Sequence, residues 1–87
     1  SDVYDFESYT RYNSDIASVY GSKMDDSGAL NHFISFGMSE GRHAHPSFNV
    51  HTYKNRYADL QKAFGNNLKA YYSHYINYGK AENRTAN

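Results

Sequence analysis

The amino-acid sequence predicts an all-α fold of two tandem repeats, each of about three short helices, packed into one compact domain. Three observations support this prediction. The chain aligns with itself over most of its length, its apolar residues recur at helical spacing, and glycines follow the apolar runs. We place the first repeat at residues 1–45 and the second at residues 46–87, which together form one folding unit.

The internal repeat appears when Tyr9 is placed over Tyr53. Residues 9–16 then align with residues 53–60, and after one two-residue difference in a loop the match resumes. A single ordered match indicates duplication, with a period of roughly 42 to 44 residues, which is in the range of helical repeat units. The main matched pairs, first copy before second, are Asp15 and Asp59, Ile16 and Leu60, His32 and His74, Phe33 and Tyr75, Gly37 and Gly79, Glu40 and Glu82, and Arg42 and Arg84.

Each copy is expected to begin with two short helices. The first helix needs a capping side chain at its start, and the second should end at a glycine in the left-handed conformation. The residues expected in these places, first copy before second, are Asp5 and Asn49 as caps, Ser14-Asp15 and Ala58-Asp59 at the start of the second helix, and Gly21 and Gly65 at its end.

A third helix carries the clearest apolar pattern. It is expected to open at Ser27 or Asn67 and to bury one stripe with i, i+3, i+4 spacing. The expected stripe is Leu30, Phe33 and Ile34 in the first copy and Tyr72, Tyr75 and Ile76 in the second, and the expected stops are Gly37 and Gly79. The only proline, Pro46, marks the connector between the copies.

Composition limits both the core and the partners. Ten Tyr, five Phe and no Trp mean that tyrosine supplies much of the buried area, with a partner for each buried hydroxyl. Nine basic and nine acidic residues give zero net charge, which disfavours nucleic acid and anionic lipid as partners. The sequence has no apolar run long enough to insert into a membrane, and no Cys for a disulfide or a Cys-based zinc site. We therefore predict neither a metal nor a cofactor.

The motifs resemble a known family. The second copy reads Tyr53-x3-Tyr57-x-Asp59-Leu60-x3-Phe64-Gly65 and then His74-Tyr75-x2-Tyr78-Gly79-x2-Glu82-x-Arg84. This pattern resembles a Tyr-rich tandem helical repeat of bacterial surface and secreted proteins, often beside cell-wall hydrolases or glycan-active domains. The resemblance covers nearly the whole chain and implies a secreted or cell-wall-associated accessory module. Asn83 departs from the pattern, which has Gly there, but Asn also tolerates the left-handed conformation.

Catalysis is not expected. Catalysis would need a base–nucleophile pair and none is evident around the repeated His32 and His74, so we interpret them as half-buried side chains bonded to a backbone carbonyl or to the repeat's own Asp or Glu. His74 is kept as a candidate ligand contact. Arg84 could grip an acidic group of a polymer, or it could stack on an aromatic ring and hold neighbouring elements together.

Tyrosine gives the strongest functional argument. Tyr71 and Tyr78 lie at i and i+7 beside the expected stripe, and the first copy has Ala29 in place of Tyr71, so the repeat itself does not require this ring. Flat rings with an outward hydroxyl suit stacking on sugars or on proteins, although the same rings could fill a Trp-free core. The candidate ligand-binding residues are Tyr71, Tyr78, Tyr12, Tyr20, His74 and Arg84.

Two functions remain open. The first is a non-catalytic extracellular binding module of a larger bacterial protein that binds a cell-wall or other glycan polymer through exposed aromatic rings. The alternative is a protein-interaction or spacer repeat that binds no glycan. In either case we also expect contacts with neighbouring repeats or with a catalytic domain of the same chain.

Overall fold

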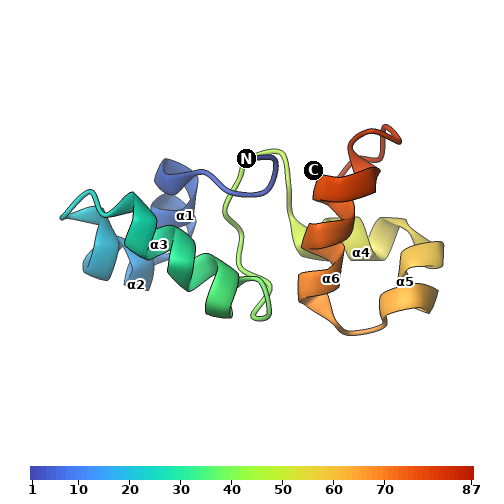
Figure 1. The fold of residues 1–87 in the computed structure, drawn as a ribbon, viewed down its shortest axis with the longest axis horizontal. Coiled ribbons are helices and arrows are strands. Elements are labelled where there is room, and N and C mark those ends of the chain that lie inside the picture. Colours follow the sequence, from blue (N-terminus) through green and yellow to red (C-terminus); the bar gives the residue numbers. More distant parts are fainter.

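Short helical segments make up both halves of the chain, with an extended connector between them (Figure 1). The computed structural model describes all of residues 1–87. The first half, residues 1–45, contains α1 (Phe6–Tyr12), α2 (Ser14–Ile16), the π-helical η1 (Ala17–Gly21), α3 (Asp26–His32) and the π-helical η2 (Phe33–Gly37). The second half, residues 46–87, contains α4 (Val50–Arg56), α5 (Ala58–Phe64), α6 (Leu68–His74) and the π-helical η3 (Tyr75–Gly79). The chain forms isolated β-bridges but no strand, so the all-α prediction is confirmed.

Side-chain caps fix where several helices start. Asp5 accepts a hydrogen bond from the Ser8 amide at the start of α1, and Asn49 accepts from the His51 and Thr52 amides at the start of α4, as predicted. Ser27 does not open the third helix, because Asp25 caps α3 and accepts from the Gly28 amide. The Asp25 cap was not predicted, because a pair of adjacent acidic residues is equally typical of an exposed loop.

The glycines have different structural roles. Gly65 has a φ of +57° and ends α5, which agrees with its predicted positive φ. Gly21 was expected to do the same, but it lies within η1 and has no positive φ. Gly37 and Gly79 end their helices as expected, and both are buried. A Cβ on Gly37 would overlap the Tyr9 hydroxyl, and a Cβ on Gly79 would overlap the Tyr53 hydroxyl.

The third helix of each half ends in a wider π-helical turn. The Met38 amide bonds to the Phe33 carbonyl and the Lys80 amide to the Tyr75 carbonyl, the i to i+5 pattern of a π-turn. The buried positions include the i, i+4 pairs Ala29 and Phe33 in the first half and Tyr71 and Tyr75 in the second, together with Tyr72. Leu30, Ile34 and Ile76 were expected in the core but are substantially exposed.

The core is a single cluster of 16 buried residues, and six of these are tyrosines, so Tyr supplies much of the buried area. Five of the six hydroxyls have hydrogen-bond partners. The two halves meet where Tyr72 packs edge-on against Phe33 and donates to the carbonyl of Arg42 at 2.6 Å. Lys69 also donates to the Ile34 carbonyl at 2.9 Å, so one continuous core joins both halves.

Candidate functional site

A buried tyrosine contacts a histidine in each half. The Tyr9 hydroxyl lies 2.7 Å from Nδ1 of His32, and the Tyr53 hydroxyl lies 2.8 Å from Nδ1 of His74. Both tyrosines are fully buried, and burial raises the pKa of each to about 12. The expectation of a half-buried histidine was correct, but its partner is a tyrosine and not a backbone carbonyl or an acid.

In each half one arginine, Arg42 or Arg84, forms ion pairs with one Asp and one Glu, and we call this set of residues the arginine clip. Arg84 donates from Nη1 and Nη2 to both carboxylate oxygens of Asp59, at 2.9 and 2.7 Å, and from Nε to Glu82 at 2.8 Å. Its guanidinium lies 4.7 Å from the centre of the Tyr57 ring. With these partners Arg84 holds the end of the chain against the start of α5, which agrees with the structural interpretation of this residue.

The first half has the same clip. Arg42 pairs with both oxygens of Asp15 at 2.7 Å and with Glu40 at 2.8 Å. The hydrogen bond from Arg42 lowers the pKa of Asp15 to about 2, and the hydrogen bond from Arg84 lowers the pKa of Asp59.

Tyr71 is not on the surface. Its side chain is fully buried, its ring packs edge-on against Phe64 at 5.3 Å, and its hydroxyl donates to the Gly65 carbonyl at 2.6 Å. The expectation that Tyr71 offers an exposed ring is wrong, because Tyr71 in α6 shares the buried face of the helix with Tyr75, one i, i+4 step further along. Tyr71 therefore cannot contact a ligand directly.

Tyr12 and Tyr20 both lie in the first half. Tyr12 is 40% exposed and stacks on His43, with the rings parallel and their centroids 4.0 Å apart. Tyr20 is half-buried beside His32. Neither ring shares a surface depression with Tyr78, so the four candidate tyrosines do not form one groove.

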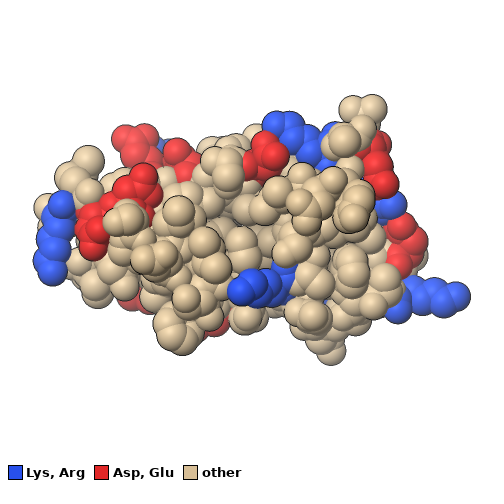
Figure 2. Space-filling view, viewed as in Figure 1, with Lys and Arg blue, Asp and Glu red and all other residues tan.

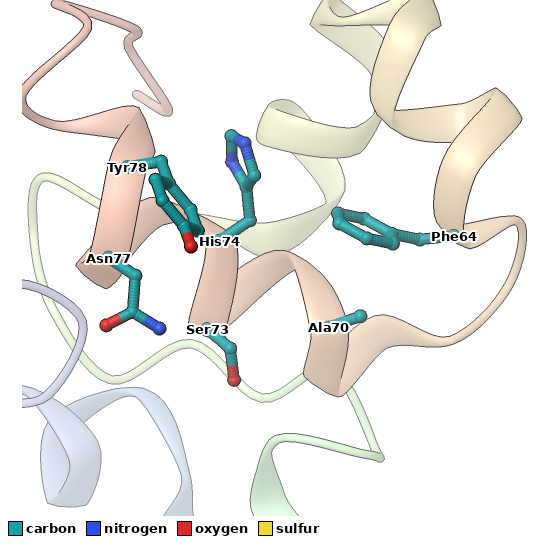
Figure 3. Close-up of a pocket in the computed structure, with 6 residues that line it drawn as sticks. All are labelled: Phe64, Ala70, Ser73, His74, Asn77 and Tyr78. Atoms are coloured by element: carbon teal, nitrogen blue, oxygen red, sulfur yellow. The ribbon is translucent and has the colours of Figure 1, made fainter.

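One open depression of about 370 Å³ lies on the second half (Figure 3). It brings together Tyr78, whose side chain is 61% exposed, and the half-buried His74. The imidazole lies between Tyr78 and Phe64, with ring centroids 5.7 Å and 5.9 Å away (Figure 3). The lining residues are Phe64, Ala70, Ser73, His74, Asn77 and Tyr78.

The first half has no matching depression. Tyr20 stands where the second half has Phe64, and its Cδ1 lies 3.0 Å from the position that a Cβ on Gly28 would occupy. Tyr20 therefore packs directly over the glycine that corresponds to Ala70. In the second half the buried Tyr71, in place of Ala29, packs against Phe64 instead.

Of the lining residues, Tyr78 and His74 are among the ligand contacts expected from the sequence, whereas Phe64, Ala70, Ser73 and Asn77 are not. A signal for these four residues was present, because each differs in type from its counterpart in the first half. The aligned residues of the first half are Tyr20, Gly28, Asn31 and Ser35.

The wider surface gives few other indications of a site. Figure 2 shows basic and acidic side chains scattered over the visible face, with no continuous block of one sign. No group of three or more His, Cys, Asp or Glu side chains is placed to hold a metal ion, and no helix is both long and apolar enough to cross a membrane. No protein-family model matches the chain, and comparisons with curated proteins and with solved structures found no match.

Proposed function

We propose that this chain is a non-catalytic binding module that binds one or two sugar units of a glycan polymer at the depression on its second half. The observation that carries the proposal is the composition of that depression, which combines an exposed Tyr78 ring with the polar side chains of Ser73, His74 and Asn77. A flat ring stacks on the apolar face of a sugar, while neighbouring polar groups bond its hydroxyls. The open shape suits a long polymer that passes through rather than a small molecule that is enclosed.

The module is proposed to consist of two copies of one helical repeat. Equivalent contacts in the two halves support this organisation, with a Tyr–His pair and an Arg–Asp–Glu clip in each. The ends of each half also pair in the same way. The Asp5 amide donates to the Ala44 carbonyl at 2.7 Å, and the Asn49 amide donates to the Ala86 carbonyl at 2.8 Å.

A role outside a bacterial cell, on the envelope or beside a glycan-active enzyme, is proposed from the sequence resemblance. A single open site of this kind binds weakly, and attachment to a catalytic domain or to further binding units would raise the effective affinity. The partners in this proposal are a cell-wall or other glycan polymer and linked domains of the same chain.

Titration with soluble glycans, followed by amide chemical shifts, tests the proposal. Peptidoglycan fragments, teichoic-acid-type polymers and glucan oligosaccharides form the panel. Binding should shift the amides of α6 and η3, and Tyr78→Ala should abolish these shifts. Phe36→Ala is the matched control, because Phe36 is the aligned residue in the first half, is 58% exposed and has no depression beside it. A panel that causes no shifts would refute the proposal.

The alternative is a protein-interaction or spacer unit. Exposed apolar side chains on η2 and η3 favour this alternative, among them Ile34, Phe36 and Ile76. It predicts concentration-dependent association, or docking of a linked domain, with no response to any glycan. Sedimentation velocity over a wide concentration range, run beside the glycan titration, separates the two functions.

A further inference from the structure

The Tyr53–His74 pair determines what His74 offers to the depression. Tyr53 is fully buried, and His74 is the only hydrogen-bond partner of its hydroxyl. Gly79 approaches this hydroxyl so closely that even a Cβ would overlap it. Because burial raises the pKa of Tyr53 to about 12, the hydroxyl keeps its proton at neutral pH.

A neutral imidazole carries its proton on only one of its two nitrogens. With the proton on Nδ1, the imidazole would donate to Tyr53, and the buried Tyr53 proton would have no acceptor. With the proton on Nε2, Tyr53 donates to Nδ1 and both groups are satisfied. Leaving a buried O–H unpaired costs its full desolvation, so the second arrangement is favoured. Nε2 of His74, which has no hydrogen-bond partner within the protein, is then a fixed N–H donor at the depression.

The other lining residues limit what this donor can meet. No Lys or Arg lines the depression, so nothing there offsets the charge of a carboxylate or phosphate. The Ala70 methyl and the Phe64 ring form an apolar wall beside His74. A neutral acceptor oxygen next to a methyl group fits these surroundings, and the acetamido group of an N-acetylated sugar has both.

We propose that the depression selects N-acetylhexosamine units, with His74 Nε2–H donating to the acetamido carbonyl, the acetamido methyl against Ala70 and Phe64, and the sugar ring on Tyr78. This inference rests on the proposed glycan-binding function and makes it specific. Tyr53 acts as a positioning residue, because it holds the imidazole in the donor form without touching the ligand.

The first measurement needs no ligand. Long-range ¹H–¹⁵N spectra at about pH 8, where an ordinary imidazole is neutral, distinguish the two tautomers. His32 and His74 should both show a protonated Nε2 and an unprotonated Nδ1. Tyr53→Phe should turn His74 into a tautomer mixture and leave His32 unchanged, while the matched Tyr9→Phe should do the reverse. A protonated Nδ1 on His74 in the unmodified protein would overturn the inference whatever the ligand result.

The second measurement compares the binding of three tetrasaccharides, one built only from N-acetylglucosamine, one only from glucose and one only from galacturonic acid. The N-acetylated oligomer should bind at least tenfold more tightly than the other two. Tyr53→Phe should weaken its binding several-fold, and Tyr9→Phe should leave it unchanged. Equal binding of the N-acetylated and glucose oligomers would overturn the selectivity but leave glycan binding intact. Absence of binding in this set and in the wider glycan panel would overturn both proposals.

Discussion

Substitution of Gly79 by alanine provides a sharp test of how the Tyr53–His74 pair is built. The new Cβ would overlap the Tyr53 hydroxyl and lie 3.1 Å from its Cζ and 3.2 Å from Cδ1 of Tyr75. All of these atoms belong to buried core rings, so none can move aside into solvent.

The expected cost follows from three contributions. Overpacking a core by one methyl costs about 1–3 kcal/mol. Displacing the Tyr53 hydroxyl from His74 leaves a buried polar group unpaired, at about 1–3 kcal/mol. Replacing a helical glycine by alanine returns about 0.5–1 kcal/mol. These contributions combine to a net loss of about 1–5 kcal/mol, with a midpoint of about 3 kcal/mol, which is a large part of the 5–15 kcal/mol that is typical of a small domain.

Urea denaturation followed by circular dichroism measures this loss, and a second substitution checks its cause. Tyr53→Phe removes the obstructing oxygen, so Gly79→Ala should cost much less in that background, with a coupling of about 1–3 kcal/mol between the two sites. Gly21→Ala is the control, because its Cβ would meet nothing closer than Cγ2 of Thr10 at 3.6 Å, and it should be neutral or stabilising. A Gly79→Ala protein as stable as the parent, or costs that simply add, would refute the close-approach argument.

Three further predictions concern pH and one turn. Pairing with arginine holds the pKa of Asp15 at about 2 and also lowers the pKa of Asp59, so the stability that these carboxylates contribute is complete above about pH 4 and is lost as the pH falls toward 2. Urea midpoints measured across that pH range should decline less in an Asp15→Asn, Asp59→Asn double variant than in the parent. An equal decline would contradict the pairing. The pKa values of Tyr9 and Tyr53 are raised to about 12, so the stability that their neutral forms contribute is complete below about pH 10 and is lost as the pH rises from 10 to 12. In an alkaline titration, the last part of the tyrosinate absorbance should appear together with the loss of the helical circular dichroism signal. Complete ionisation of tyrosine with the helices intact would be inconsistent with burial of these two rings. Gly41 has a φ of +73°, and a Cβ there would lie 2.8 Å from Leu68 and 2.9 Å from His51 of the second half. Gly41→Asn should therefore cost about 1–2 kcal/mol in urea unfolding, whereas Asn83→Gly at the aligned turn should change the stability by less than about 0.5 kcal/mol. Equal effects would show that a glycine at position 41 is not needed where the two halves meet.

Features that depend on local chemistry were predicted well from the sequence. The caps at Asp5 and Asn49 and the positive φ of Gly65 require only a few neighbouring residues. The departure at Asn83 was also interpreted correctly, since its φ is +61° where the first half has Gly41 at +73°. A residue that tolerates the left-handed conformation preserves the turn in both halves.

Features that depend on helix phase or on distant contacts were not predicted. The expected stripe places Leu30 and Ile34 inward and leaves Tyr71 outside, but the buried face is turned toward the i, i+4 pairs Ala29 and Phe33, and Tyr71 and Tyr75. An apolar pattern with aromatic or aliphatic residues on adjacent faces does not by itself fix which face turns inward. The tyrosine partner of His74 was missed for a different reason, because Tyr53 lies on another helix and only the packed fold brings the two side chains together.

Tyr71 is buried and does not contact a ligand, but it supports one wall of the depression from within the core. Ala29 occupies the aligned position in the first half, where Tyr20 packs over Gly28. In the second half the Tyr71 ring lies against Phe64 and its hydroxyl binds the carbonyl of the next residue, which fixes the end of α5 as one wall of the depression. Residues that the halves share therefore account for the Tyr–His pair and the arginine clip. All the lining residues of the depression except His74 differ from their counterparts in the first half, and Tyr71, a further difference, supports the depression from within the core.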